Sequence, residues 1–127
     1  RWPYLGAFLA QANLALGRSA DAAEIAEVAA SSAIAVERGL GLGVLARIRG
    51  AEGDEAEAER LIAEAVALVE QTDFLFDRGT VFSDQAEVMR LLGRADESRK
   101  ALERALGEFE RKGDLVSSAR TRELLER

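Results

Sequence analysis

The sequence predicts an all-α fold of repeated helical hairpins, and three observations support this prediction. Hydrophobic residues make up 48% of the chain but aromatic residues only 6%, and alanine, the best helix former, dominates the hydrophobic set. The single proline is Pro3, so no later helix is interrupted by a proline ring. Gly17, Gly53 and Gly93 each lie in a short polar break between amphipathic stretches, 36 and then 40 residues apart. A break that recurs at this interval is typical of stacked helical hairpins.

The breaks divide the chain into three hairpins and a final helix. The helices are expected, in order, over residues 4–16 and 20–37, 39–51 and 54–71, 78–92 and 95–111, and 114–126. We therefore expect a right-handed solenoid of three hairpins (4–37, 39–71 and 78–111) plus a C-terminal capping helix, as a single domain over 1–127. Because the chain starts with Arg1 and not with methionine, it is expected to be a fragment of a longer protein.

The second helix of each later hairpin has a clear apolar stripe at the spacing of one helix face. The two stripes are Ala58, Leu61, Ile62, Ala65, Val66 and Val69, and Ala101, Leu102, Ala105, Leu106 and Phe109. Ser19, Asp54 and Asp114 are expected N-caps, and Gly113 is expected to end a helix. Apolar residues of the last helix are expected to cover Leu102 and Phe109, namely Leu115, Val116, Ala119 and Leu124.

Two segments leave alternatives open. Phe74 and Phe76 in the expected linker over 72–77, with Phe82 beyond it, indicate either a recognition patch or a plug between hairpins. The three glycines of the run over 39–43 lack the spacing of a dinucleotide-binding loop and the lysine of a phosphate-binding loop. That run is therefore interpreted as a loose helix start or a tight helix crossing.

Charge and composition exclude several classes of function. The net charge of −6 disfavours nucleic acid and anionic membranes as partners of this domain. Nine carboxylates against one arginine over residues 51–77 indicate a solvated helix face or a docking face for a basic partner. With no histidine and no cysteine, imidazole and thiolate chemistry are absent, so we expect no enzyme, no cofactor and no metal. Asp84 and Glu87 offer an acid–base pair, but carboxylates on such a helix are usually solvated. The lack of cysteine fits a cytoplasmic protein.

Small residues recur at fixed distances from the break glycines. The three sets are Ala10, Gly17, Ala22 and Ala29; Ala46, Gly53, Ala58 and Ala65; and Ala86, Gly93, Ser98 and Ala105. This spacing resembles the tetratricopeptide repeat family, which implies close helix crossings at these positions and a groove that binds a protein or peptide. The chain departs from the family period of about 34 residues and has Ser19, Glu55 and Ala95 where the family has an aromatic residue.

A narrower resemblance covers residues 84–106 and 109–122. These segments are similar to the C-terminal repeats of large actinobacterial regulators, which join a cyclase or DNA-binding domain, an ATPase module and helical repeats. The 15 arginines against 2 lysines fit a GC-rich bacterial genome. The resemblance implies the sensor or protein-binding arm of a bacterial regulator.

The expected function is therefore a protein–protein interaction scaffold. Mapping the family's groove onto the first helices gives partner-binding residues Tyr4, Gln11, Arg47, Thr80, Ser83, Glu87 and Arg90. Arg47 and Arg90 either bind an acidic segment or chain terminus, or pair with Glu87 and neighbouring acids; in both cases they are expected to face solvent and to add little stability. Two alternatives are a small-molecule sensor, with a pocket at Ala7, Gly43 and Gly50, and a structural arm that self-associates into homo-oligomers.

Overall fold

The computed structural model describes residues 5–127, and this part of the chain is all-helical, as the sequence predicts. Its helices are α1 (Leu5–Ala15), α2 (Ser19–Ala30), α3 (Ala35–Ala51), α4 (Glu55–Glu70), α5 (Leu75–Leu91), α6 (Ala95–Lys112) and α7 (Leu115–Leu125). Within residues 5–127 no strand is present. Tyr4, which is predicted to line the groove, lies outside the described residues.

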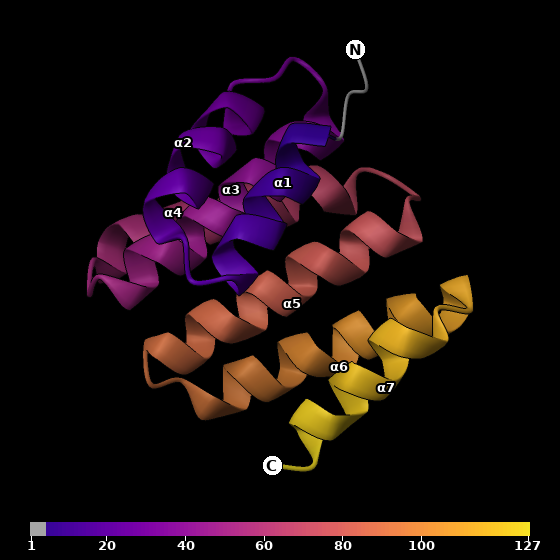
Figure 1. Ribbon diagram of the computed structural model, residues 1–127. Coiled ribbons are helices and arrows are strands. Elements are labelled where there is room, and N and C mark those ends of the chain that lie inside the picture. The colour runs from indigo at the N-terminus through magenta and orange to yellow at the C-terminus, as the bar shows by residue number, and fades with distance from the viewer. Residues whose placement is uncertain (1–4) are drawn as a thin grey trace.

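The helices pack in the order of the chain. Each helix contacts the next, and the first helices of the hairpins also contact one another, α1 with α3 and α3 with α5. Figure 1 shows this progression from α1 and α2 at one end to α6 and α7 at the other, with α5 crossing the middle. Most of α3 is buried because it packs against α1, α2, α4 and α5. The first helices thus share one face of the molecule.

The break glycines end their helices as predicted. Gly17, Gly53, Gly93 and Gly113 have φ angles of 77°, 83°, 76° and 80°, in the left-handed region that glycine adopts without strain. At Gly53 a substituted Cβ would meet nothing within 4 Å, so the glycine is required by its backbone angle and not by crowding.

The small residues at repeat spacing are all buried. Ala10, Ala22, Ala29, Ala46, Ala58, Ala65, Ala86, Ser98 and Ala105 form this set. Ser98 replaces an alanine of the pattern, and its hydroxyl donates a 2.7 Å hydrogen bond to the carbonyl oxygen of Ala86. That bond joins α6 to α5 and satisfies the buried hydroxyl, so serine is tolerated at a close crossing.

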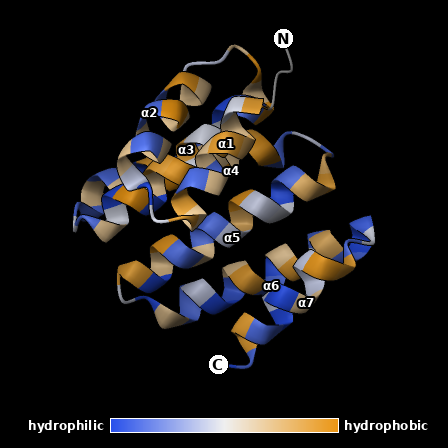
Figure 2. Cartoon of the chain, viewed as in Figure 1, coloured by the Kyte–Doolittle hydropathy of each residue, from blue (hydrophilic) through white to orange (hydrophobic). Residues whose placement is uncertain are grey.

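The apolar stripe predicted for α4 is its buried face, residue for residue. The stripe of α6 is only partly correct: Ala101, Ala105 and Phe109 are buried, but Leu102 and Leu106 are half-buried. Glu108 is buried in their place and pairs with Arg78 of α5, with 3.2 Å between Nε and Oε2. Hydrophobic and hydrophilic residues are interspersed along the helices (Figure 2).

Three helix boundaries differ by several residues from the prediction: the end of α2 and the starts of α3, at Ala35 and not at Gly39, and of α5. The second helix ends at Ala30, not at Glu37, because Ser32 Oγ donates to Glu37 and accepts from the amide of Ile34, which turns the chain before α3. Likewise, α5 begins at Leu75 and not at Arg78, after Thr72 Oγ1 accepts from the amide of Phe74.

The two turns are equivalent at a separation of 40 residues. Arg38 and Arg78 each reach back to a carbonyl oxygen of the preceding turn, that of Ser32 and that of Thr72. An acid, an arginine and a glycine recur in the same order, at residues 37–39 and 77–79. This repeated motif was a sequence signal for both helix starts, and the apolar periodicity alone missed it.

Asp54 and Asp114 cap α4 and α7, accepting from the amides of Glu57 and Ser117 as predicted. Ser19 does not cap α2; the cap position is Arg18, which makes no side-chain capping bond. The reason is that the helix begins one residue earlier than predicted, so Ser19 is already its first helical residue.

The predicted packing face of α7 is wrong. Leu115 and Val116 are 81% and 75% exposed, and Ala119 and Leu124 are exposed as well. The residues buried in the packing of α7 against α6 are instead Ser117, Ser118 and Thr121. Small hydroxyl side chains allow close approach. Two of them bond locally, Ser117 Oγ to Asp114 and Thr121 Oγ1 to the carbonyl of Ser117, so their burial leaves few polar groups unsatisfied.

The glycine run in α3 forms a tight helix crossing, one of the two interpretations from sequence. A Cβ on Gly41 would lie 2.6 Å from the amide nitrogen of Ala30 and 2.8 Å from the carbonyl oxygen of Ala26. Backbone atoms of α2 cannot give way as a flexible side chain can. This glycine therefore sets the distance between the first and second hairpins.

We expect Gly41→Ala to lower the free energy of unfolding by about 1–3 kcal/mol through this overlap. Gly107→Ala is the matched control, since Gly107 also lies inside a helix but a Cβ there meets nothing within 4 Å. It should raise stability by about 0.5–1 kcal/mol through helix propensity. Urea denaturation of both variants checks this, and equal stabilisation by the two substitutions would show that the crossing is not tight.

Candidate functional site

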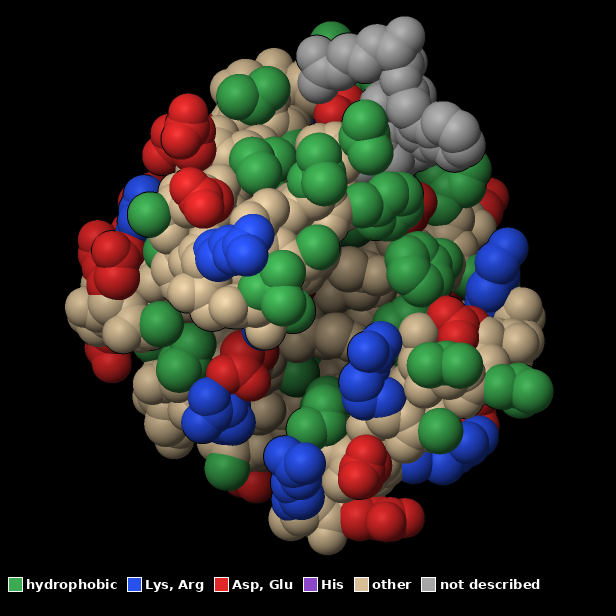
Figure 3. Space-filling model, viewed as in Figure 1, with side chains coloured by type: hydrophobic (Ala, Val, Ile, Leu, Met, Phe, Trp, Pro, Cys, Tyr) green, Lys and Arg blue, Asp and Glu red, His purple; other side chains and the backbone are tan. Residues whose placement is uncertain are grey.

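A cavity of about 500 Å³ opens on the face shared by the first helices. Its walls come from α1, α3, α5 and α7, with one residue of α6. In the space-filling view it is the hollow near the centre, with hydrophobic side chains along one rim and charged side chains along another (Figure 3). The cavity thus has two chemically different ends.

Five of the seven residues predicted for the groove line this cavity: Gln11, Arg47, Thr80, Ser83 and Glu87. Arg90 does not line it, and its guanidinium pairs with Glu87 on the same helix instead. For Arg90, the structure therefore shows the alternative considered from sequence, pairing with a helix acid. Tyr4 lies outside the described residues. A role in binding a partner stays a prediction for all of them.

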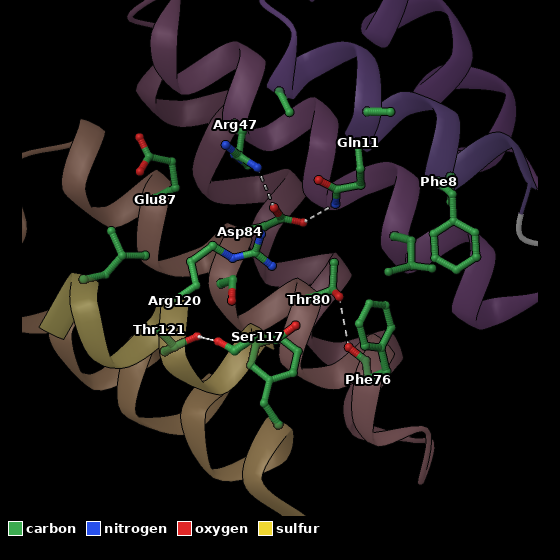
Figure 4. Close-up of a pocket in the computed structure, with 17 residues that line it drawn as sticks. Phe8, Gln11, Arg47, Phe76, Thr80, Asp84, Glu87, Ser117, Arg120 and Thr121 are labelled. Atoms are coloured by element: carbon green, nitrogen blue, oxygen red, sulfur yellow. Dashed lines mark hydrogen bonds and ion pairs between the residues drawn. The ribbon is translucent and has the colours of Figure 1, made fainter. Parts of the chain in front are cut away.

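A buried carboxylate, Asp84 of α5, forms the floor of the cavity. Its Oδ1 accepts from Arg47 of α3 at 3.2 Å, and its Oδ2 accepts from Gln11 Nε2 of α1, also at 3.2 Å (Figure 4). This cluster joins the three hairpins through one side chain. The expectation that Asp84 is solvated is wrong, because α5 packs against α3 with Asp84 in the stripe between Val81 and Val88.

Burial controls the charge of Asp84. The pKa of its carboxyl is raised from 3.8 to about 6, chiefly because burial removes solvent, and the Glu87 charge also raises it; the Arg47 charge and the hydrogen bonds from Gln11 and Arg47 oppose the shift. Both oxygens of Asp84 accept a hydrogen bond, and both oxygens of Glu87 accept from Arg90.

Gly43 of α3 makes room for this carboxylate. A Cβ on Gly43 would lie 2.5 Å from Asp84 Oδ2. The sensor alternative placed an empty pocket at Ala7, Gly43 and Gly50, and the structure corrects this. Ala7 lines the cavity, but Asp84 occupies the space beside Gly43, and Leu91 packs against Gly50.

Three phenylalanines form the apolar end. The ring centroids of Phe8 and Phe76 are 6.5 Å apart and those of Phe76 and Phe109 are 6.0 Å apart, in tilted arrangements. Phe109 is buried, while Phe8 and Phe76 are 44% and 37% exposed at the cavity. Of the predicted plug, only Phe82 is fully buried, and Phe74 is exposed. Sequence reasoning missed Phe8 and Phe109 as cavity residues.

Arg120 of α7 lies at the other end of the cavity, opposite the phenylalanines. Sequence reasoning missed this residue as well. Its side chain extends from α7 toward Asp84 (Figure 4). It makes no hydrogen bond or ion pair within residues 5–127. The hydroxyls of Thr80, Ser117 and Thr121 are occupied by bonds to neighbouring groups of their own helices or caps. Arg120 is therefore a cation at the cavity that makes no ion pair among residues 5–127, although its charge interacts with Asp114.

The acidic run over 51–77 lies mostly exposed along α4 and its flanks, and several of its acids pair with arginines, such as Glu59 with Arg94 and Glu70 with Arg104. Among the described residues, no group of three or more acidic side chains is arranged to hold a metal ion. No helix within residues 5–127 combines the length and apolar character needed to cross a membrane.

Comparison with protein-family models, with curated proteins and with solved structures gave no match for this chain.

Proposed function

We propose that this domain is a protein–protein interaction scaffold, the regulatory or sensor arm of a larger bacterial regulator, and that it binds a partner segment in the cavity. The observation that carries the proposal is the convergence of α1, α3, α5 and α7 on one hollow with exposed phenylalanines at one end and Arg120 at the other. Aromatic and arginine side chains are the residues that most often dominate binding energy at interfaces.

The order of packing supports the finer architecture in this proposal. Contacts of each helix with the next, together with the contacts α1–α3 and α3–α5, are those expected of stacked hairpins in a right-handed solenoid. The small residues that resemble the tetratricopeptide pattern are buried at helix crossings, which supports that assignment too. In such an array the first helices line the concave side.

Blocking the cavity is expected to abolish binding of a partner segment. Ala12 lines the cavity and is exposed, so Ala12→Trp should fill the hollow without disturbing the core. Ala56→Trp is the control, at an exposed position of α4 away from the cavity. Peptides selected from a displayed random library against the wild-type domain would be titrated against all three proteins.

We expect the wild type and Ala56→Trp to bind a selected peptide equally, and Ala12→Trp to bind at least about tenfold more weakly, the loss expected for one excluded anchor. Equal affinity of Ala12→Trp would place the binding surface elsewhere. Failure to enrich any peptide would count against the scaffold function.

A second candidate is a small-molecule sensor, and the size of the cavity favours it. A volume of about 500 Å³ lies within the range of roughly 300–1,000 Å³ that is usual for small-molecule sites. The mixture of apolar walls and a few polar groups is also usual for such sites.

A further inference from the structure

One cation of the cavity lining makes no ion pair. Asp84 pairs with Arg47, and Glu87 pairs with Arg90, which lies outside the lining. Arg120 makes no hydrogen bond or ion pair among residues 5–127, although its charge interacts with Asp114 at the start of α7. The guanidinium of Arg120 is therefore open to bind a ligand, and its charge favours an anionic one.

The cavity also has more unsatisfied hydrogen-bond donors than unsatisfied acceptors. Three donors at the cavity have no acceptor in the described chain: the Arg120 guanidinium, the Ser83 hydroxyl and the buried Nε of Arg47. The oxygens of Asp84 and Glu87 are already bonded, which leaves two open side-chain acceptors among these residues, the amide oxygen of Gln11 and the hydroxyl oxygen of Ser83. A ligand that supplies acceptors, as a carboxylate does, satisfies more of these groups than a donor would.

The opposite end offers contact area and no charge. Phe8 and Phe76 present exposed ring surface beside the buried ring of Phe109. Leu40 and Ala7 continue this wall inside the cavity. An apolar group laid against the rings would remove their surface from water, which is the main source of affinity in small apolar sites.

We propose that the cavity binds a small organic acid whose apolar body lies against Phe8 and Phe76 and whose carboxylate is held by Arg120. This inference rests on the small-molecule function proposed above and names its ligand class. The carboxylate would bind the guanidinium through two parallel hydrogen bonds, the geometry that arginine favours.

A series of three probes with the same apolar body tests the charge requirement. 4-Phenylbutyrate, 4-phenylbutan-1-ol and 4-phenylbutylamine would be titrated into the whole chain by calorimetry. We expect the acid to bind, the alcohol to bind about tenfold more weakly or worse, and the amine not to bind, since a charged hydrogen bond contributes about this factor.

Arg120→Gln should reduce the affinity for the acid to that of the alcohol. Arg122→Gln is the matched control, because Arg122 lies two residues further on α7, pairs with Glu110 and does not line the cavity. The affinity of Arg122→Gln for the acid should equal that of the wild type. Phe76→Ala should weaken the binding of the acid and of the alcohol by the same factor. Thermal denaturation followed by circular dichroism would show that each variant is folded.

The outcomes separate this inference from the function on which it rests. If the alcohol or the amine binds as tightly as the acid, or if Arg120→Gln binds the acid unchanged, the cavity is a small-molecule site but not one for acids. If none of the three probes binds, both the inference and the small-molecule candidate are overturned. The scaffold proposal is judged separately, by the peptide titrations.

Discussion

Replacing Phe82 with alanine is expected to lower the free energy of unfolding by about 3–5 kcal/mol, a large part of the 5–15 kcal/mol typical of a domain. Phe82 is fully buried in α5. The guanidinium carbon of Arg104 in α6 lies 3.9 Å from its ring centroid, and Arg104 also pairs with Glu70 of α4 at 2.9 Å. Loss of the ring would leave a void where α4, α5 and α6 meet, and would also remove the cation–π contact.

Phe74→Ala is the matched control. Phe74 precedes α5, its side chain is 54% exposed, and it makes no side-chain capping bond. Its replacement should change stability by less than about 0.5 kcal/mol. Urea denaturation of both variants checks the contrast. Similar losses for the two would mean that Phe74 is buried in solution, as the plug interpretation from sequence has it.

The fold could be predicted largely because helix periodicity and glycine breaks are local signals. The break glycines and the stripe of α4 were read from the sequence as the structure has them. The helix starts at Ala35 and Leu75 were missed because hydroxyls of Ser32 and Thr72 compete with the helix ladder, which apolar spacing does not register. The face of α7 was missed because hydrophobicity was weighed above close packing of small side chains.

The candidate site was only partly accessible to sequence reasoning. Mapping the family's groove found five lining residues, because they occupy one face of each first helix. Arg120 was missed since α7 was interpreted as a cap and not as a wall of the cavity. Asp84 was missed because a carboxylate usually predicts exposure. The signal was present, however: Asp84 occupies a core position, three residues after Val81 and four before Val88.

Asp84→Asn is expected to raise the free energy of unfolding at pH 7 by up to about 3 kcal/mol. The pKa of Asp84 is about 6 in the folded chain against 3.8 for an ordinary aspartate, and each unit corresponds to about 1.4 kcal/mol. At pH 7 the folded protein must hold a buried charge that Arg47 compensates only in part. Asparagine keeps the shape and can still bond Gln11 without that charge.

The sign of the pH dependence follows from linkage. Because the folded pKa is raised, the folded state binds a proton more readily than the unfolded state between pH 6 and pH 3.8. The wild type should therefore gain stability relative to Asp84→Asn as the pH falls through this window, and the two should become equal near pH 4. Acids with lowered pKa, such as Glu57 and Asp114, titrate in both proteins, so the difference between them isolates Asp84.

Arg47→Met tests the other side of the pair. The Arg47 side chain is 32% exposed, so its charge is partly screened, and its removal should cost about 2 kcal/mol at pH 7 and much less at pH 4. The expected loss is larger than the sequence alone predicts for Arg47, because the structure pairs Arg47 with a buried carboxylate. Urea titrations at several pH values compare the free energies of unfolding of the wild type and Asp84→Asn. A difference that stays constant with pH would show that Asp84 is solvated. A more stable asparagine variant would instead indicate that the chain retains, at the floor of its cavity, a charge that weakens the fold, as ligand-binding sites often do.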